Sequence, residues 1–305
     1  MTKVTIVIVN WRTPLLLRRC LQAIAKDDQA ASFEVYVVDN ASADQSLSIL
    51  ANEFSYVKVI ANDTNTGFSK ACNQAIPQAL GEYVLLLNPD TIVVESAISK
   101  LASFLDNHAK CGAVGPKILN DDGTLQLACR LAFPSLAASF FRLTYLSKLL
   151  PKHPLIAKYN MTYSDPSLES EVDALSGSCM MVRKSIIDKI GLLDENIFMF
   201  GEDIDWCWRV KEAGWQVYYY PEAVIYHSHG AASRLRPIGT TFDLHKGMAV
   251  FYGKHIAPKH WPIFNWMVYA LIWLRAILFV AVNLVKSQIK IPAKQNFSDI
   301  PVEKL

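Results

Sequence analysis

Short apolar runs rich in β-branched residues alternate with stretches of helical periodicity through the first third of the chain. The runs show no regular apolar–polar alternation, which is typical of strands covered on both faces. They are Val4–Val9, Glu34–Val38, Tyr56–Ile60 and Tyr83–Leu87. The helical stretches are Leu15–Ala25, Ala43–Phe54, Gly67–Ala79 and Ala97–Asn107. This rhythm predicts an α/β fold with a mostly parallel open sheet and helices on both faces.

The rest of the chain is less regular. Residues 134–154 suit a helix with flexible flanks, and residues 160–171 suit a mobile loop. Further strands are expected at Ser178–Val182, Val217–Tyr220 and Val224–Tyr226, and further helices at Lys184–Ile190 and Asp203–Glu212.

Polar residues mark the ends of the predicted strands. Asn10, Asp39, Asn65 and Asp90 lie at or just after such ends, where ligands bind in open parallel sheets. Asp39 could equally belong to a helix cap. Gly67 either brings backbone N–H groups to face phosphate or sugar oxygens, or only makes a tight turn.

A cluster of acidic residues lies between Phe200 and Arg209. Glu202, Asp203 and Asp205 occur there beside aromatic and apolar residues. Carboxylates cost free energy to bury, so such a cluster indicates a task. Together with Asp90, it predicts that one acid holds a metal and another moves a proton. An ion pair between Asp205 and Arg209 on the surface is the alternative for Asp205, and Trp206 suits either the core or the wall of an acceptor pocket.

Residues 261–291 predict an amphipathic helical tail. At about 100° per residue, its polar residues fall within an arc of roughly 80°. They are Asn265, Arg275, Asn283, Lys286 and Lys290. A broad apolar face with a narrow basic stripe suits a helix in the membrane interface, so we expect residues 258–291 to contact a membrane surface. A single span, with Arg275 costing about 2.5–3.5 kcal/mol, and packing in the core are the alternatives.

Composition narrows the function classes. The chain has 305 residues, of which 51% are hydrophobic and 19% charged, as expected for a globular protein with a large core. A net charge of +2 argues against nucleic acid as a partner. The six cysteines form no CxxC pair, so a reducing cytoplasm is the simplest location.

The combination of motifs resembles glycosyltransferase family 2, and within it a branch similar to the rhamnosyltransferases of bacterial polysaccharide biosynthesis. The matching segments, in chain order, are Thr5–Trp11, Val38–Ser42, Asn65–Phe68, Leu86–Thr91, Ser176–Val182, Phe200–Asp205 and Tyr226–Gly230. The resemblance implies the GT-A fold and inverting transfer. Residues 1–118 would form the nucleotide-sugar half, residues 119–240 the acceptor and catalytic half, and residues 241–305 the helical membrane-associating region.

The resemblance also implies roles for single residues. Donor-binding positions would be Asn10, Asp39, Asn65, Gly67, Asn88 and Asp90. Asp90 and His227 would hold Mg²⁺ or Mn²⁺ at the diphosphate. Asp203 would be the catalytic base, with Glu202 beside it, and Asp205 and Trp206 would lie in the acceptor region. One departure is Asn88, which stands where the family's DxD motif begins with Asp.

The sequence therefore predicts a peripheral enzyme on the cytoplasmic face of the inner membrane. It would move a sugar, possibly L-rhamnose from dTDP-L-rhamnose, to a polyprenyl-diphosphate-linked saccharide of O-antigen or another surface polysaccharide. A nucleotide-sugar nucleotidyltransferase is one alternative, although the residues after the first strand form no Gly-rich basic loop. A non-catalytic scaffold of a polysaccharide assembly complex is the other.

Overall fold

The computed structural model describes residues 2–228 and 230–288. The strands of the main sheet are β1 Val4–Asn10, β2 Phe33–Asp39, β3 Lys58–Ala61, β4 Tyr83–Leu87, β5 Thr91–Val94, β6 Cys111–Leu119, β8 Ser170–Glu171, β10 Cys179–Arg183 and β11 Gln216–His227. Their order is β3-β2-β1-β4-β10-β6-β11-β5, and β8 pairs with β11. A separate two-stranded sheet joins β7 Arg130–Leu131 to β9 Ala174–Leu175.

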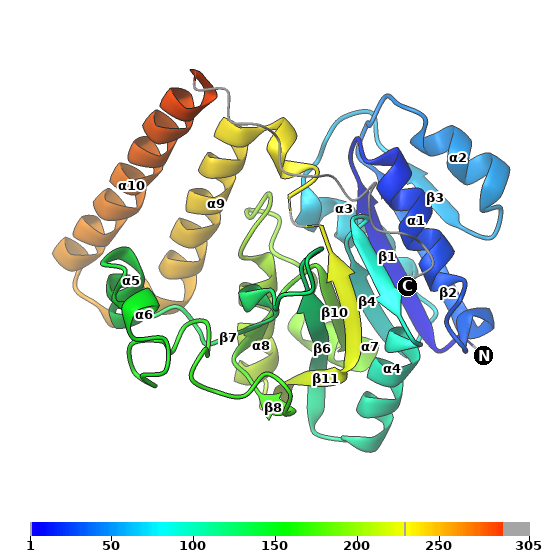
Figure 1. The fold of residues 1–305 in the computed structure, drawn as a ribbon, viewed down its shortest axis with the longest axis horizontal. Helices are drawn as coiled ribbons and strands as arrows, with labels where there is room; N and C mark the ends of the chain where they lie inside the picture. The colour runs from blue at the N-terminus through cyan, green and yellow to red at the C-terminus, as the bar shows by residue number, and fades with distance from the viewer. Residues whose placement is uncertain (1, 229, 289–305) are drawn as a thin grey trace.

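The first half of the sheet is parallel, as the sequence predicts. β1 lies between β2 and β4 and pairs with both in parallel. Every residue of β1 and β4 is buried, which explains their unbroken apolar runs. α1 Pro14–Ile24 and α2 Ser46–Glu53 cover one face of these strands, and α3 Phe68–Ala75 covers the other (Figure 1). The register places Asn10 beside Asp39 at the carboxyl ends of β1 and β2.

The second half of the sheet is mixed. β10 runs antiparallel to both β4 and β6, and β11 pairs in parallel with β6 but antiparallel with β5 and β8. β11 is one strand where the sequence predicts two. Its pairing with β6 shifts register between Tyr220 and Val224, around Pro221, and this irregularity interrupts the strand pattern in the sequence. The sequence pattern did not predict β5 or β6, both of which extend this half.

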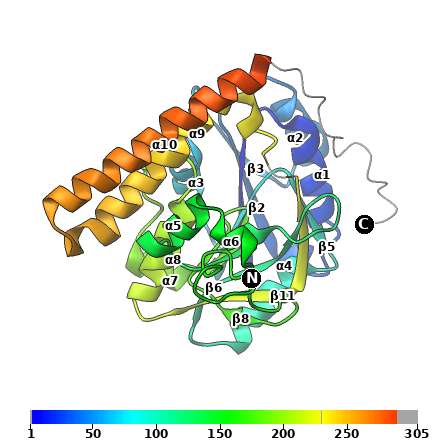
Figure 2. The ribbon, with the colours of Figure 1, turned by 60° about the vertical axis from the view of Figure 1, so that its left-hand side comes forward.

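The remaining helices pack around this half and beyond it. They are α4 Ala97–Asn107, α5 Leu136–Leu143, α6 Leu146–Leu149, α7 Lys184–Ile190, α8 Glu202–Glu212, α9 Pro237–Phe251 and α10 Pro262–Gln288. The sequence did not predict α9, which packs against α10 as a helical hairpin at the side of the sheet (Figures 1 and 2). α5 lies near the lower end of this hairpin (Figure 1).

Three polar residues of α10, Asn265, Arg275 and Asn283, face the protein rather than solvent. Asn265 accepts a hydrogen bond from Tyr252 Oη at 2.6 Å, Arg275 Nη1 donates to His245 Nε2 at 3.2 Å, and Asn283 Nδ2 donates to Thr241 Oγ1 at 3.3 Å. Lys290, in the predicted stripe, lies outside the described residues. The outward face is apolar: Ile263 is 86% exposed and Trp266 is 78% exposed. A water-soluble helix has the opposite arrangement.

The segment Pro262–Leu284 has a mean hydropathy of 2.0 and is only 11% buried, so by length and composition it could cross a membrane. Both interfacial docking and a single span therefore remain compatible with α10, whereas packing of its outer face in a core does not.

Candidate active site

Asn10 and Asp39 form a buried polar pair at the carboxyl ends of β1 and β2. Asn10 Nδ2 donates to Asp39 Oδ2 at 2.8 Å and to Ser46 Oγ at 2.9 Å. Asp39 also accepts from the backbone N–H of Ser42 at 3.0 Å and from its hydroxyl at 2.6 Å. The carboxylate is 2% exposed. It is therefore held in one orientation at the strand end, and the predicted donor role of both residues stays a prediction.

The turn at Asn65–Gly67 fastens the start of α3 to the loop before α8. Gly67 has φ +86°, and a Cβ there would approach the Phe198 carbonyl oxygen to 2.7 Å. Its N–H donates to Asn65 Oδ1 at 3.0 Å, and the N–H of Phe68 donates to the Phe198 carbonyl at 2.7 Å. These N–H groups are used within the protein, which favours the tight-turn interpretation of Gly67 over phosphate binding.

Asp90 meets His227 beyond the end of β4. His227 Nε2 lies 3.2 Å from Asp90 Oδ1 and 3.4 Å from Asn88 Nδ2. Its Nδ1 lies 2.8 Å from Gln126 Oε1. The amide of Gln126 is oriented by its Nε2, which donates to the Asn120 side chain at 3.1 Å and to the His227 carbonyl at 3.3 Å. Nδ1 therefore carries a proton, and Nε2 faces the Asp90 carboxylate.

This arrangement fits a divalent metal. Asp90 Oδ1 and His227 Nε2, which lie 3.2 Å apart, can be joined by a proton or by a metal cation, and a second hydrogen bond that fixes the His tautomer is typical of metal-ligating histidines. Among the described residues there is no group of three or more His, Cys, Asp or Glu side chains that could hold a metal ion. The protein would thus supply two ligands, Asp90 and His227, as Mg²⁺ and Mn²⁺ sites completed by substrate phosphates do. Gln126 belongs to no motif in the sequence, so its role beside His227 was not predicted.

Glu202 and Asp203 begin α8 and are held against the loop before β10. Asp203 Oδ2 accepts from the Gly177 N–H at 2.8 Å, and Oδ1 accepts from the Ile204 N–H at 2.8 Å. Burial raises the pKa of Asp203 despite these bonds. Burial, with the neighbouring charge of Asp203, raises the pKa of Glu202 to about 8. Within the described structure, Glu202 Oε2 is buried without a hydrogen-bond partner.

One short segment joins the two acidic positions. The Ser178 carbonyl accepts from the Asn88 N–H at 2.9 Å, and the preceding residue, Gly177, donates to Asp203. A Cβ on Gly177 would lie 3.3 Å from the Asp203 side chain, so glycine permits this close approach. The end of β4 and the start of α8 therefore lie on either side of a single backbone loop, which sequence spacing alone did not indicate.

Glu202→Gln is expected to stabilise the protein more at pH 8 than at pH 5. Between the usual carboxyl value of 4.5 and about 8, the unfolded chain loses this proton and the folded protein keeps it, so Glu202 lowers stability as pH rises through this window. The cost is about 1.4 kcal/mol per pH unit at most. Thermal unfolding at both pH values measures it. Glu212→Gln, at the exposed end of α8, is the control. An equal gain at both pH values contradicts the prediction.

Asp205 differs from its predicted surface pair, whereas Trp206 takes the core position that was one of its two predicted alternatives. Asp205 is fully buried, and its carboxylate pairs with Arg209 at 2.9 Å, Lys254 at 2.9 Å and His255 at 2.7 Å. Burial alone would raise its pKa, but hydrogen bonds from Lys254 and His255 lower it. This is no surface pair: it ties α8 to the turn after α9. Trp206 is also fully buried and donates to the Gly191 carbonyl, so neither side chain presents a surface to an acceptor. His229 lies outside the described residues.

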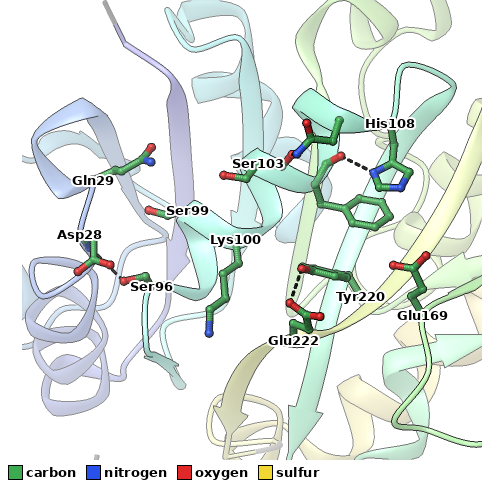
Figure 3. Close-up of a pocket in the computed structure, with 12 residues that line it drawn as sticks. Asp28, Gln29, Ser96, Ser99, Lys100, Ser103, His108, Glu169, Tyr220 and Glu222 are labelled. Atoms are coloured by element: carbon green, nitrogen blue, oxygen red, sulfur yellow. Dashed lines mark hydrogen bonds between the residues drawn. The ribbon is translucent and has the colours of Figure 1, made fainter.

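A polar hollow of about 380 Å³ lies elsewhere, between α4 and β11 (Figure 3). Its lining includes Lys100, Glu169, Tyr220 and Glu222. It contains none of the predicted site residues, and Tyr220 Oη donates to Glu222 within it at 2.7 Å. The hollow is thus separate from the strand-end site.

The sequence model of the family described as "Glycosyltransferase like family 2" matches residues 2–237. The N-acetylglucosaminyl-diphospho-decaprenol L-rhamnosyltransferase of Mycobacterium tuberculosis is 29% identical over 267 residues, covering 83% of this chain and 85% of that protein.

Solved structures share the fold. A mannosyltransferase from Pyrobaculum calidifontis, in complex with GDP-Man and Mn²⁺, aligns with a TM-score of 0.57 at 17% identity over 95% of this chain and 76% of that one. TarS 1–349 of Staphylococcus aureus aligns with a TM-score of 0.54 at 17% identity over 90% of this chain and 80% of that one. At these identities the likeness establishes the GT-A architecture alone.

Proposed function

This chain belongs to the glycosyltransferase-like family 2, and from that membership we propose that it is an inverting, metal-dependent glycosyltransferase acting on a lipid-linked saccharide. The donor is a nucleotide sugar, and dTDP-L-rhamnose is the first candidate because the Mycobacterium tuberculosis relative is named as an L-rhamnosyltransferase. The same name includes N-acetylglucosaminyl-diphospho-decaprenol, which supports a lipid-linked saccharide as acceptor. The product belongs to O-antigen or another surface polysaccharide.

One observation carries the proposal: the loop Ser176–Ser178 hydrogen-bonds the end of β4 on one side and Asp203 on the other. It supports placing the departing diphosphate near Asp90 and the attacking hydroxyl near Asp203. Asn10 and Asp39, joined at the adjacent strand ends, are proposed to hold the nucleotide.

The proposed mechanism uses Asp203 as general base. The acceptor hydroxyl gives its proton to Asp203 as its oxygen attacks the anomeric carbon from the face opposite the diphosphate, which inverts that centre. Burial raises the pKa of Asp203. A general base works best when its pKa lies near the working pH, so this shift suits Asp203 to the role at neutral pH. Asp90 and His227 would hold Mg²⁺ or Mn²⁺, which supplies positive charge to the diphosphate.

The exposed apolar face of α10 supports a lipid acceptor and contact with a membrane surface, which we propose is the cytoplasmic face of the inner membrane. Its polar residues Asn265, Arg275 and Asn283 are already bonded to α9 and to the turn that follows it. The outward residues include Ile263, Trp266 and Ile277, which are 86%, 78% and 61% exposed. Such a surface lowers its free energy by entering the membrane interface.

The proposal is tested with a panel of nucleotide sugars and Mg²⁺ or Mn²⁺, scored for nucleoside diphosphate release with and without a polyprenyl-diphosphate saccharide. Acceptor-dependent release with one sugar is expected. Release of pyrophosphate from a sugar phosphate and a nucleoside triphosphate would indicate the nucleotidyltransferase instead. Absence of turnover with every donor would indicate the scaffold.

A triple change on the outer face of α10, Ile263→Gln with Trp266→Gln and Ile277→Gln, is expected to move most of the protein from membranes to the soluble fraction. Each change removes about 2 kcal/mol of apolar burial, whereas the contacts to α9 stay intact. Sedimentation with vesicles measures the shift. The control changes three exposed apolar residues of other elements, Leu15→Gln, Leu47→Gln and Leu80→Gln, which are 66%, 44% and 70% exposed. Unchanged sedimentation of the α10 variant would remove this face as the anchor.

A further inference from the structure

The segment around α5 and α6 carries positive charge and no acidic residue. Residues 123–164 contain neither Asp nor Glu. Arg130 in this segment is 2% exposed and donates to the carbonyl groups of Ser164 and Asp165. The other basic residues of the segment are all exposed, and they are Arg142, Lys148, Lys152 and Lys158. Four positive charges therefore face solvent in a stretch that offers no carboxylate of its own.

The same segment exposes large apolar side chains. Their exposed fractions lie between 47% and 73%, and they are Phe140, Tyr145, Leu149, Leu150 and Leu155. Apolar residues gathered on a surface mark contacts with other proteins or with membranes. We call these five residues, with the four exposed basic residues, the α5–α6 patch.

The outer face of α10 lacks the positive charge that this patch has. Between Trp261 and Leu284, Arg275 is the only charged residue of the sequence. It faces α9, where its Nη1 donates to His245 Nε2 at 3.2 Å. Binding at a membrane interface depends on buried apolar area and on attraction to anionic lipids. This stretch of α10 offers the first, and the α5–α6 patch offers both.

Trp208 of α8 lies between the segment that leads into α5 and the end of α9. Its ring centre is 4.6 Å from that of Phe133 and 5.7 Å from that of Phe251, the last residue of α9. The patch therefore lies at the end of the hairpin where α10 begins (Figures 1 and 2). Trp261 and Ile263, at this same end, are 84% and 86% exposed, and tryptophan is enriched at membrane interfaces.

The patch is also connected to the proposed catalytic loop. β7, which precedes the patch, pairs with β9, and β9 is followed directly by Ser176–Ser178. The N–H of Phe133 donates to the Asp173 carboxylate, just before β9, at 3.0 Å. A membrane bound at the patch would thus have a defined orientation relative to this loop.

We propose that the α5–α6 patch binds the surface of an anionic bilayer and, together with the start of α10, forms one membrane-contacting surface. The lysine ammonium groups lie at the lipid phosphates, and the apolar side chains enter the interface between headgroups and acyl chains. Basic residues interspersed with exposed apolar residues match this partner, because a bilayer presents anionic groups above hydrocarbon. That the docked protein turns its catalytic loop toward a lipid-linked acceptor rests on the proposed function.

The first test measures binding of the full chain to phosphatidylcholine vesicles with and without phosphatidylglycerol. The triple change Lys148→Gln, Lys152→Gln and Lys158→Gln is expected to weaken binding to phosphatidylglycerol vesicles about 100-fold, since each basic residue near an anionic surface contributes about fivefold. Binding to pure phosphatidylcholine should equal that of the wild type, because every apolar residue is retained. High salt should remove most of the difference between the two proteins.

The matched control changes three exposed lysines outside the patch, Lys26→Gln, Lys110→Gln and Lys189→Gln. It removes the same net charge and should bind phosphatidylglycerol vesicles as the wild type does. Unchanged affinity of the patch variant overturns the proposal. An equal loss in the control variant overturns it too, because the attraction would then depend on net charge alone.

The second test asks whether the apolar residues enter the bilayer. All six native cysteines are buried, so Leu149→Cys can be labelled selectively with a fluorophore that responds to polarity. Its emission should move to shorter wavelength when phosphatidylglycerol vesicles are added. Leu80→Cys is the control, because Leu80 lies outside the patch and is 70% exposed against 73% for Leu149. Its label should not respond.

Two results of the label experiment contradict the proposal. Emission at position 149 that stays unchanged with vesicles shows that this side chain does not reach the interface. A shift that appears without vesicles, as protein concentration rises, indicates a second copy of this chain as the occupant of the patch.

Sugar transfer is measured separately, so that the two proposals can fail independently. A wild type that binds phosphatidylglycerol vesicles through the patch but transfers no sugar would refute the proposed function and leave the docking surface standing. Transfer by the wild type, with unaltered vesicle binding of the patch variant, would do the reverse.

Discussion

Asp203→Asn is expected to lower the rate of sugar transfer by about 10²–10⁴-fold, the usual contribution of a general base, and to leave binding of the nucleotide sugar nearly unchanged. Asparagine keeps the size of the side chain and one oxygen for the Gly177 N–H, which donates to Asp203 at 2.8 Å. It cannot accept the proton of the acceptor hydroxyl. Donor affinity and single-turnover transfer, measured on the same preparation, separate the two effects.

The pH profile of the wild type gives an independent reading of the same group. Burial raises the pKa of Asp203, so transfer should fall as pH decreases, with a midpoint above the ordinary aspartate value. Asp188→Asn, which removes an exposed carboxylate from α7, is the matched control because its side chain is 65% exposed. Retained transfer in Asp203→Asn would remove this residue from the role of base.

Asp90→Asn is expected to lower nucleoside diphosphate release about 100-fold or more, because a divalent ion contributes several kcal/mol to such reactions. Asp90 Oδ1 lies 3.2 Å from His227 Nε2, and a neutral amide would bind the cation far more weakly.

Gln126→Leu should raise the Mn²⁺ concentration needed for half-maximal release about 10–100-fold, as loss of such supporting hydrogen bonds does.

The readout is a Mn²⁺ titration of donor turnover, together with direct Mn²⁺ binding. Asp121→Asn is the control. The Asp121 carboxylate is exposed and accepts a hydrogen bond at 2.8 Å from the hydroxyl of Ser228, the residue that follows His227. If Asp90→Asn turns over the donor fully at the Mn²⁺ concentration that the wild type requires, Asp90 is not a metal ligand.

Part of the candidate site could be predicted from the sequence. Asn10, Asp39, Asn65 and Asp90 could be placed at or just after strand ends because buried parallel strands have distinctive apolar runs. Gln126 could not be found in this way, since it follows an irregular turn and meets His227 across 101 positions of sequence. Asp205 was misjudged because its i,i+4 spacing to Arg209 suggested a surface pair, whereas Lys254 and His255 arrive from a distant element.

For the tail, too, one part could be predicted from the sequence and another depended on tertiary packing. Periodicity alone identified a long helix with a narrow polar stripe, and α10 has both. Which way the stripe points depended on α9, whose pattern is weak and which the sequence did not predict. Because Arg275 and Asn283 of the stripe hydrogen-bond His245 and Thr241 of α9, the apolar side of α10 faces outward.

The sequence by itself determined the family and, apart from β5, β6 and α9, the local elements that form the site and the tail, because apolar period, turn residues and ordered motifs are properties of neighbouring positions. Only the tertiary structure decided which polar groups meet. The bridge from Asn88 through Ser178 and Gly177 to Asp203 and the ion pairs of Asp205 with Lys254 and His255 depend on contacts between distant segments. Burial then sets their energies, and no single stretch of sequence contains that information.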